Sequence, residues 1–391
     1  MIRHSEAVLA GHPDKFCDQI ADRIIAAAYE TDPEAYAQIE VSIWSDWIWI
    51  NGGIVTRKPF EGDLQELVRE VGVEVGYCRD ALRYHPDDKG SNHVDVERYK
   101  IANAVCRTHG DPTEWTHHVN DQAIVIGWAG YDEKVRFLPP EHFLAHSLRE
   151  ALDDSFRLGG RLERQGPDGK LLVRIRENEH TDCRDNTWEV EEILVTVQQR
   201  EDAEFGAVCE GVAEVIRATW QEMANNDSRW RTDWEDISLL VNPNGPLLNG
   251  GSDGDNGQTG RKLVMDYYGP RVPLGGGALS GKDLTHIDRA GACAARAACV
   301  EAVAEGAGTA EVLVAYAPGR SGPLDVRWTT DRRSRVTENR DRFAHDAARG
   351  VSLAALEAGA FDGLGRGRHF FSEEAPWNAT LSGSDRGVSD S

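Results

Sequence analysis

The chain has 391 residues, 40% of them hydrophobic, which suffices for one large composite domain or for two or three ordinary ones. Its formal net charge of −23 excludes the broad basic face that nucleic acids and anionic membranes require. The start lacks the apolar core of a signal peptide, no apolar run is long enough to span a membrane, and the seven cysteines include no CxxC pair. We therefore expect a cytoplasmic protein with reduced thiols.

In chain order, the first third predicts a helix, two strands and a second helix. The ranges are 13–28, 39–43, 47–55 and 64–71, from helical and alternating apolar periods. Gly52-Gly53, inside the second strand, is a turn candidate. Residues 107–120 are polar and rich in His and Thr, which predicts a mobile loop that closes over a site as a lid.

From residue 121 onwards strands alternate with helices. The predicted strands are 121–129, 171–176, 188–199, 238–241, 311–317 and 323–329. The predicted helices are 141–157, 202–222, 286–304 and 338–357. The alternation repeats roughly three times, although the sequence alone does not prove a duplication.

A candidate phosphate site begins the first helix, at GHPDK (11–15). Free N–H groups and the positive end of the helix dipole suit a phosphate there. His12, Asp14 and Lys15 supply a donor, a metal ligand and a cation. An ordinary explanation also exists, because Pro13 and Asp14 favour the first turn of any helix.

The glycine-rich loop at 242–262 carries a second charged cluster. It lacks the spacing of a Walker A motif, yet it presents Asp253 and Asp255 shortly before Arg261 and Lys262. A linker alone would not need a basic pair beside so many backbone N–H groups.

The stretch GGGALSGKD (275–283) is a third cluster. Its glycines can form an anion nest, Lys282 adds a charge, and Asp283 and Asp288 can hold a divalent ion. A glycine-rich hinge packed under a helix is the alternative. Basic residues beside acidic metal ligands in glycine-rich loops suit a polyphosphate with Mg²⁺, so we expect these glycines to approach phosphates.

These stretches resemble the motifs of S-adenosylmethionine synthetases (methionine adenosyltransferases). GHPDKFCDQIAD resembles the N-terminal ATP motif of that family. GGSDGDNGQTGRKLVMDYYG and GGGALSGKDLTHIDRAGACAAR resemble its two most diagnostic later stretches, in the same order and spacing. DQAIVIGWA resembles the strand after its gate, and PDGK (167–170), by itself an ordinary turn, its middle phosphate lysine. The similarity runs from about residue 4 to Trp377.

The resemblance implies a mixed α/β (α+β) fold of three related strand–helix subdomains about a pseudo-threefold axis, with sheets packed at a dimer interface. The subdomains expected are 1–107, 115–236 and 237–377, with a disordered tail at 378–391. The implied reaction is attack of a thioether sulfur on C5′ of ATP, followed by hydrolysis of the released triphosphate to phosphate and diphosphate. The implied partners are ATP, methionine or a related thioether, and a further copy of the chain in a homodimer or a dimer of dimers.

The resemblance also implies roles for single residues. The catalytic positions are His12, near O5′, and three that grip the triphosphate, Lys170, Arg261 and Lys282. The further ATP-binding positions are Asp168, Asp255, Lys262 and Ala278. The sulfur-substrate pocket corresponds to Ile54, Asp121, Asp255 and His286. The implied cofactors are Mg²⁺, as two ions at Asp14 and Asp288, and K⁺ at Glu40.

The amino-acid contacts depart from the family pattern. The family has Glu where this chain has Ile54, Lys where it has His286, and an Arg-Phe pair where it has Pro246-Leu247. The family gate GAGDQG reads HVNDQA at 118–123, and a family Gln has no match in 107–112. Most triphosphate contacts are thus retained, while the contacts to the amino acid are largely replaced.

Four functions remain open at this stage. The first is synthesis of S-adenosylmethionine from ATP and methionine, and the second is the same chemistry on another thioether or amino acid. The third is a non-catalytic regulatory paralogue, and the fourth is a triphosphatase that kept only the second half-reaction. His12, Lys170, Arg261 and Lys282 argue against the third, because a subunit without chemistry has no use for them.

Overall fold

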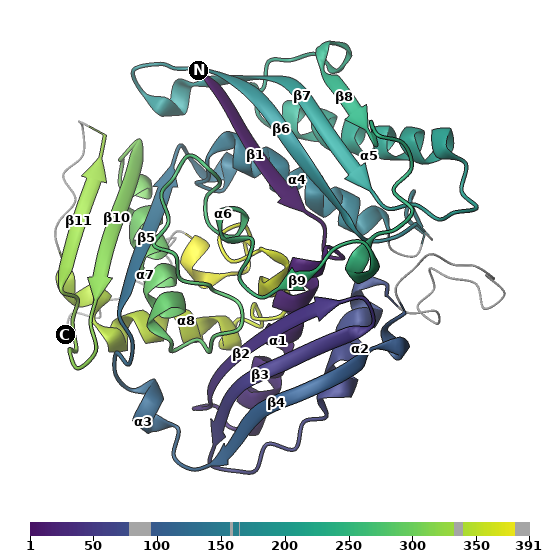
Figure 1. Cartoon of the computed structure of the whole chain (residues 1–391). Coiled ribbons are helices and arrows are strands. Elements are labelled where there is room, and N and C mark those ends of the chain that lie inside the picture. The colour runs from purple at the N-terminus through teal and green to yellow at the C-terminus, as the bar shows by residue number, and fades with distance from the viewer. Residues whose placement is uncertain (78–94, 157–158, 164, 332–338, 380–391) are drawn as a thin grey trace, which may run out of the picture.

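The computed structural model describes residues 1–77, 95–156, 159–163, 165–331 and 339–379. In this part of the chain three sheets surround the middle of the molecule (Figure 1). Each sheet packs against one long helix, and that helix pairs with a second helix. The expectation of a mixed α/β fold with three subdomains is confirmed.

The sheets and their helices are as follows. The first sheet has the order β4 (Lys100–His109), β3 (Trp47–Thr56), β2 (Tyr36–Trp44) and β9 (Gly257–Gln258), with α1 (Pro13–Thr31) and α2 (Leu64–Val75). The second has the order β1 (Ile2–Val8), β6 (Gly169–Asn178), β7 (Thr187–Val197) and β8 (Ser238–Val241), with α4 (Pro140–Ser155) and α5 (Phe205–Asn226). The third has the order β11 (Asp325–Thr330), β10 (Thr309–Tyr316) and β5 (Ala123–Gly130), with α7 (Ile287–Ala304) and α8 (His345–Glu357). Single turns form α3 (Thr113–Thr116) and α6 (Leu263–Asp266) in the connections.

The three sheets exchange strands. The N-terminal strand β1 pairs with β6, β5 pairs with β10, and β9 pairs with β2. Each sheet therefore contains a strand from another third of the chain. The subdomain boundaries 1–107, 115–236 and 237–377 remain a prediction, and the strand exchange means that no sheet is built from one of these segments alone.

Two local predictions were wrong. Gly52-Gly53 is no turn: both residues lie inside β3, and a Cβ on Gly52 would stand 1.9 Å from the carbonyl oxygen of Gln38. Glycine is needed there because β2 and β3 approach closely and Gly52 has φ +133°. The loop predicted at 107–120 is partly regular, since residues 107–109 end β4 and 113–116 form α3.

Three strands escaped prediction because none has a clear apolar alternation, and one of them, β9, has only two residues. β1 reads IRHSEAV, and β4 reads KIANAVCRTH and pairs in parallel with β3 at the edge of its sheet. The last predicted helix, 338–357, begins at His345 in the structure, after a short 3₁₀ turn over Arg340–Phe343. Residues 380–391 of the predicted tail lie outside the described residues.

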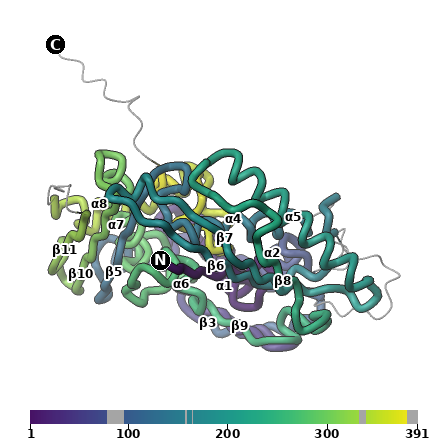
Figure 2. The backbone as a smooth tube through the Cα atoms, turned by 90° about the horizontal axis from the view of Figure 1, so that it is seen from above, coloured from purple at the N-terminus to yellow at the C-terminus, as the bar shows by residue number. Residues whose placement is uncertain are grey.

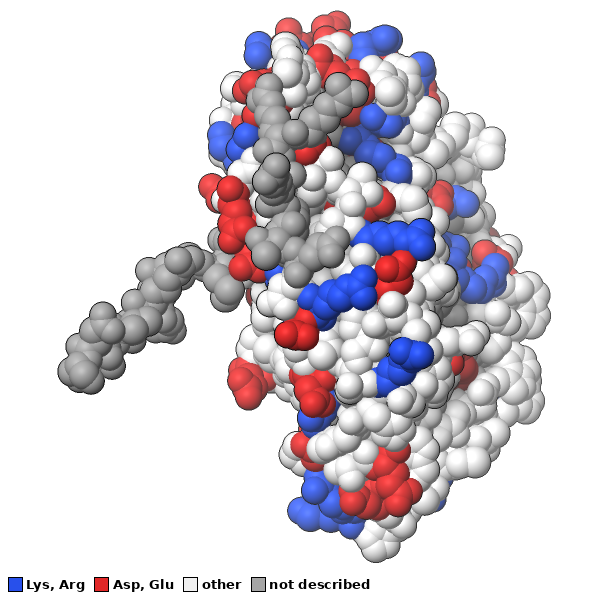
Figure 3. Space-filling view, turned by 90° about the vertical axis from the view of Figure 1, so that its left-hand side faces the viewer, with Lys and Arg blue, Asp and Glu red and all other residues white. Residues whose placement is uncertain are grey.

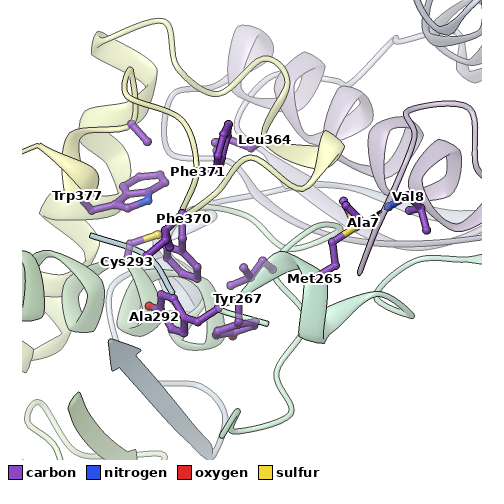
Figure 4. Close-up of a cluster of buried hydrophobic side chains, with 14 of the residues drawn as sticks. Ala7, Val8, Met265, Tyr267, Ala292, Cys293, Leu364, Phe370, Phe371 and Trp377 are labelled. Atoms are coloured by element: carbon purple, nitrogen blue, oxygen red, sulfur yellow. Dashed lines mark hydrogen bonds between the residues drawn. The ribbon is translucent and has the colours of Figure 1, made fainter. Parts of the chain in front are cut away.

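The N-terminal strand β1 and the C-terminal segment meet in one apolar cluster. Val8 of β1 donates its backbone N–H to the sulfur of Met265 in α6, and Tyr267 and Cys293 bring α6 and α7 together (Figure 4). Leu364, Phe370, Phe371 and Trp377 of the C-terminal segment pack into the same cluster. This packing fixes the start of α1, which follows β1, relative to α7.

The outward face of the first sheet is unusually apolar. Ile48 and Ile50 point to the helix side and are buried, whereas Trp47 and Trp49 are each 41% exposed and stack on each other at 5.9 Å. In Figure 2, β3, β9 and β10 lie towards one side of the molecule and α4, α5 and α8 towards the other. The side of the molecule near β11 instead carries interspersed acidic and basic side chains (Figure 3).

Candidate active site

The start of α1 forms one half of the site. His12 caps the helix in an extended conformation, and its Nδ1 accepts the backbone N–H of Asp14 at 3.2 Å. The proton of the neutral imidazole is therefore on Nε2, which is left as a donor. Burial and the charge of Lys262 lower the pKa of His12 to about 4, although Asp14 and Asp255 oppose this shift. His12 is thus an uncharged donor at neutral pH.

Asp14 binds the basic pair of the 242–262 loop. Its Oδ2 lies 2.7 Å from Nζ of Lys262, and its Oδ1 lies 3.6 Å from Nη1 of Arg261. Oδ1 also accepts the backbone N–H of Gln258 in β9 at 2.9 Å. The carboxylate is 1% exposed, so it holds the basic loop against the helix start.

The start of α7 repeats this arrangement. His286 caps α7 with nearly the same backbone angles as His12, φ −60° and ψ 131° against −62° and 135°, and accepts the N–H of Asp288 at 3.2 Å. Asp288 contacts Lys282 as Asp14 contacts Lys262. Burial and Lys282 lower the pKa of His286 too. HPDK and HIDR are therefore matching helix starts, and the shared spacing of His, Asp and a basic residue is the signal that could have identified the second one from the sequence.

The fourth residue of each motif, Lys15 or Arg289, has a structural task. Lys15 is fully buried and binds Asp18 at 2.7 Å together with Asp266. Burial alone would lower the pKa of Lys15, but these two carboxylates raise it. Arg289 of α7 is equally buried and binds Asp22 of α1. Lys15 is therefore not available to a phosphate, contrary to the sequence-based expectation.

The start of α4, the long helix that packs on the second sheet, is occupied by an ion pair within the protein. Glu141, in the first turn of α4, accepts hydrogen bonds from Nε and Nη2 of Arg271 at 2.9 and 2.7 Å. Arg271 also binds Glu177 at 3.0 Å. The pseudo-threefold arrangement thus offers two helix starts with a capping histidine and a third whose acidic residue is neutralised by an arginine.

Strand β2 links the two open helix starts. Ser42 and Ile43 pair with β9, next to Asp14, while Gln38 pairs with Lys282. Glu40 lies between these two contacts, and desolvation by the surrounding protein raises its pKa although Lys282 opposes the rise. The two halves of the site therefore lie along one strand with Glu40 between them.

Most of the predicted site residues lie near one of the two helix starts, that of α1 or that of α7. Lys170, exposed at the start of β6, and Asp255 act on His12 electrostatically, and Asp121 acts on His286. Asp168 accepts the N–H of Gly251 at 2.8 Å, and burial raises its pKa to about 6. Ala278 lies against the basic loop, since a Cβ on Gly260 would stand 2.8 Å from it.

Two predicted positions are used within the protein. Oδ1 of Asp283 accepts hydrogen bonds from the backbone and hydroxyl of Thr285 and the backbone of His286, and Oδ2 accepts the N–H of Ala37. Asp283 is therefore used within the protein, contrary to its prediction as a metal ligand. Ile54 is fully buried and points to the helix side of β3 with Ile48 and Ile50. Within a single chain Ile54 belongs to the core.

Three of the four glycines in 275–281 approach protein atoms closely, whereas Gly276 has open space around it. A Cβ on Gly275 would stand 1.6 Å from the carbonyl oxygen of Ile124, and one on Gly277 would stand 2.6 Å from Cγ of Asp288. The loop passes between β5 and α7. The reason for glycine at 275 and 277 is thus close contact with the protein itself, and not contact with a phosphate as the sequence predicted.

The carboxylates suit metal ions that arrive with the substrate. The described ranges contain no cluster of three or more His, Cys, Asp or Glu side chains placed for a metal. Mg²⁺ in nucleotide sites commonly takes one or two carboxylates and completes its shell with phosphate oxygens and water. Asp14 and Asp288, each a single carboxylate beside a lysine, fit that arrangement.

Comparisons with known proteins agree with this geometry. Models of the N-terminal, central and C-terminal domains of S-adenosylmethionine synthetase match residues 1–96, 116–247 and 249–360. An S-adenosylmethionine synthase of Methylobacterium radiotolerans is 34% identical over 332 residues, covering 82% of this chain and 78% of that protein. One of Methylorubrum populi is 34% identical with the same coverage, and one of a Mycobacterium species (strain KMS) is 33% identical and covered to 80%.

The chain belongs to the S-adenosylmethionine synthetase family. The enzymes of this family are ATP-using transferases that depend on divalent and monovalent cations, so the expectation of a methionine adenosyltransferase-like enzyme is confirmed at the level of the family. In the described ranges no helix has the length and apolarity to cross a membrane.

Proposed function

We propose that the protein transfers the adenosyl group of ATP to the sulfur of methionine. The sulfur attacks C5′, the C5′–O5′ bond breaks, and the triphosphate leaves whole before water cleaves it to diphosphate and phosphate. The observation that carries this proposal is the pair of matching helix starts along β2, each with a neutral histidine donor, a carboxylate and a lysine. Displacement at carbon needs alignment and a stabilised leaving group more than acid–base catalysis.

The charged pairs suggest how the triphosphate is held. Asp14–Lys262 and Asp288–Lys282 are ion pairs in the free chain, so neither pair carries a net charge. We propose that Asp14 and Asp288 turn to Mg²⁺ when ATP binds, which frees both lysines for phosphate oxygens. Two Mg²⁺ ions would then offset part of the leaving-group charge, and K⁺ at Glu40 would sit between the two halves.

We propose the remaining roles from the resemblance to the family. His12 would donate its Nε2–H near O5′, where charge grows as the C5′ bond breaks. Lys170 and Arg261 would bind the triphosphate from its other side. Asp168, Asp255 and Ala278 would contact the nucleotide, and Asp121 and His286 the sulfur substrate.

Identification of the products tests the proposal. The protein is incubated with ATP, methionine, MgCl₂ and KCl, and adenosylated products are separated and weighed by mass spectrometry. S-adenosylmethionine is the expected product. An adduct that forms only when another thioether replaces methionine would favour the alternative substrate. Phosphate release without any adduct would favour a triphosphatase, and no turnover would favour a regulatory paralogue.

The His286 position leads to a prediction about methionine affinity. A zwitterion needs a cation for its carboxylate, and a neutral His286 offers only a weaker, uncharged hydrogen bond. We expect a KM for methionine above about 1 mM, and a lower KM in His286→Lys. A micromolar KM in the unmodified protein would contradict this.

A homodimer is the expected assembly. Trp44, Trp47 and Trp49 are 51%, 41% and 41% exposed on one face of the first sheet, an apolar surface that a second copy would cover. Sedimentation at micromolar concentration should give at least twice the mass of one 43.2 kDa chain. A mass near one chain would reject the dimer.

The cellular compartment is also part of the proposal. The six described cysteines are all unpaired. Free thiols of this kind persist where the surroundings are reducing, so we propose that the enzyme acts in the cytoplasm.

A further inference from the structure

The connection from β4 to β5, residues 110–122, packs against the start of β2 and against the connection between β10 and β11. We call this connection the strap. Thr116 and Val119 are buried, and the ring of Trp115 lies 5.9 Å from that of Tyr36 at the start of β2. The carbonyl of Val119 accepts the N–H of Gly319, in the connection between β10 and β11, at 3.3 Å.

One carboxylate joins the strap to both neighbours. Oε2 of Glu34, which precedes β2, accepts a hydrogen bond from Nε2 of His117 in the strap at 2.7 Å. The same oxygen accepts one from Nη2 of Arg349 in α8, also at 2.7 Å. Since a carboxylate only accepts, His117 carries a proton on Nε2 in this contact. Glu34 thus connects the first sheet, the strap and the third subdomain.

The strap ends at the second half of the active site. Asp121, four residues after His117, is close enough to His286 to influence it electrostatically. The first residue of α8, His345, contacts the carbonyl of Thr285 at 3.2 Å, and Thr285 directly precedes His286. Strap, α8 and the start of α7 are therefore joined by consecutive contacts.

We propose that Glu34 and His117 are positioning residues that latch the strap and thereby hold Asp121 beside the start of α7. The proposal rests on the proposed function, because Asp121 matters only if the sulfur substrate binds at this half of the site. Neither residue touches the reacting atoms. Their effect on catalysis is through the position of the strap.

The latch is tested with two readouts on the full-length protein. Chymotrypsin cleavage after Trp115, identified by mass spectrometry, reports release of the strap without reference to activity. The KM for the sulfur substrate, measured separately from kcat, reports the position of Asp121. In His117→Ala, which removes the donor to Glu34, we expect faster cleavage and a KM raised about two- to fivefold, the range that loss of one partly exposed contact to a carboxylate permits, with kcat nearly unchanged.

Matched variants separate the latch from general damage. Glu114→Gln removes a negative charge from the same strap at an exposed position and should leave both readouts unchanged. His117→Lys again places a donor opposite Glu34 and should recover most of the loss. Glu34→Ala, which removes the acceptor, should loosen the strap at least as much as His117→Ala does.

Three results would overturn the proposal. Unchanged cleavage in His117→Ala would show that the strap is not latched by this contact, and a raised cleavage rate with unchanged KM would show that the latch does not position Asp121. Failure of His117→Lys to recover either readout would exclude the contact with Glu34 as the cause. The cleavage readout holds even in a protein that forms no sulfonium product, so failure of the latch and failure of the proposed function are distinguishable.

Discussion

Lys282→Ala should lower kcat/KM for ATP by roughly 30- to 1000-fold, equivalent to about 2–4 kcal/mol of transition-state stabilisation. Lys282 is held at the start of α7 by Asp288 and is only 12% exposed, so its charge acts in a site with little water. Removing it takes away a preorganised cation and also leaves Asp288 without its partner. Steady-state kinetics at saturating methionine measure the effect.

The control for this substitution is Lys58→Ala. Lys58 is exposed and lies outside the site, so its removal should leave kcat/KM within about twofold. Thermal unfolding of both variants shows whether the loss at Lys282 is a loss of folded protein. An unaltered kcat/KM in Lys282→Ala would exclude its role on the triphosphate.

Ile54→Glu should lower the free energy of unfolding by more than about 3 kcal/mol, because it places an unpaired carboxylate in the core. Ile54 is fully buried on the helix side of β3. Urea denaturation measures the loss, and Ile54→Val, expected to cost only about 0.5–1.5 kcal/mol, is the matched control.

The same variant decides between two views of this position. The resemblance places Ile54 in the sulfur-substrate pocket, whereas a single chain places it in the core. If Ile54→Glu folds as stably as the unmodified protein and binds methionine more tightly, the position faces the substrate in the assembled enzyme and the core assignment is wrong.

Some of the site followed from the sequence because its signals are local. The cap, the first-turn carboxylate and the dipole of α1 are properties of five consecutive residues, GHPDK, and the basic pair Arg261-Lys262 is likewise contiguous. The spacing of Asp14, Asp18 and Asp22 along one helix face could also have indicated that α1 binds several partners.

Other features depend on contacts between distant segments. Asp266 lies 251 residues from Lys15 and turns that lysine into a buried structural cation. The strands β1, β5 and β9 pair outside their own third of the chain, which no local pattern specifies. The latch joins Glu34 to Arg349 across 315 residues, and its members look like ordinary surface charges in the sequence.

The central claim is that the triphosphate leaves whole and is cleaved only afterwards. A ³¹P NMR time course with ATP, Mg²⁺, K⁺ and methionine tests it most directly, with sulfonium product quantified in the same samples. The account predicts that diphosphate and phosphate appear in equal amounts, matched by the adenosylated product, and that ADP does not form. Formation of ADP and phosphate, or phosphate release that does not require methionine, would contradict it.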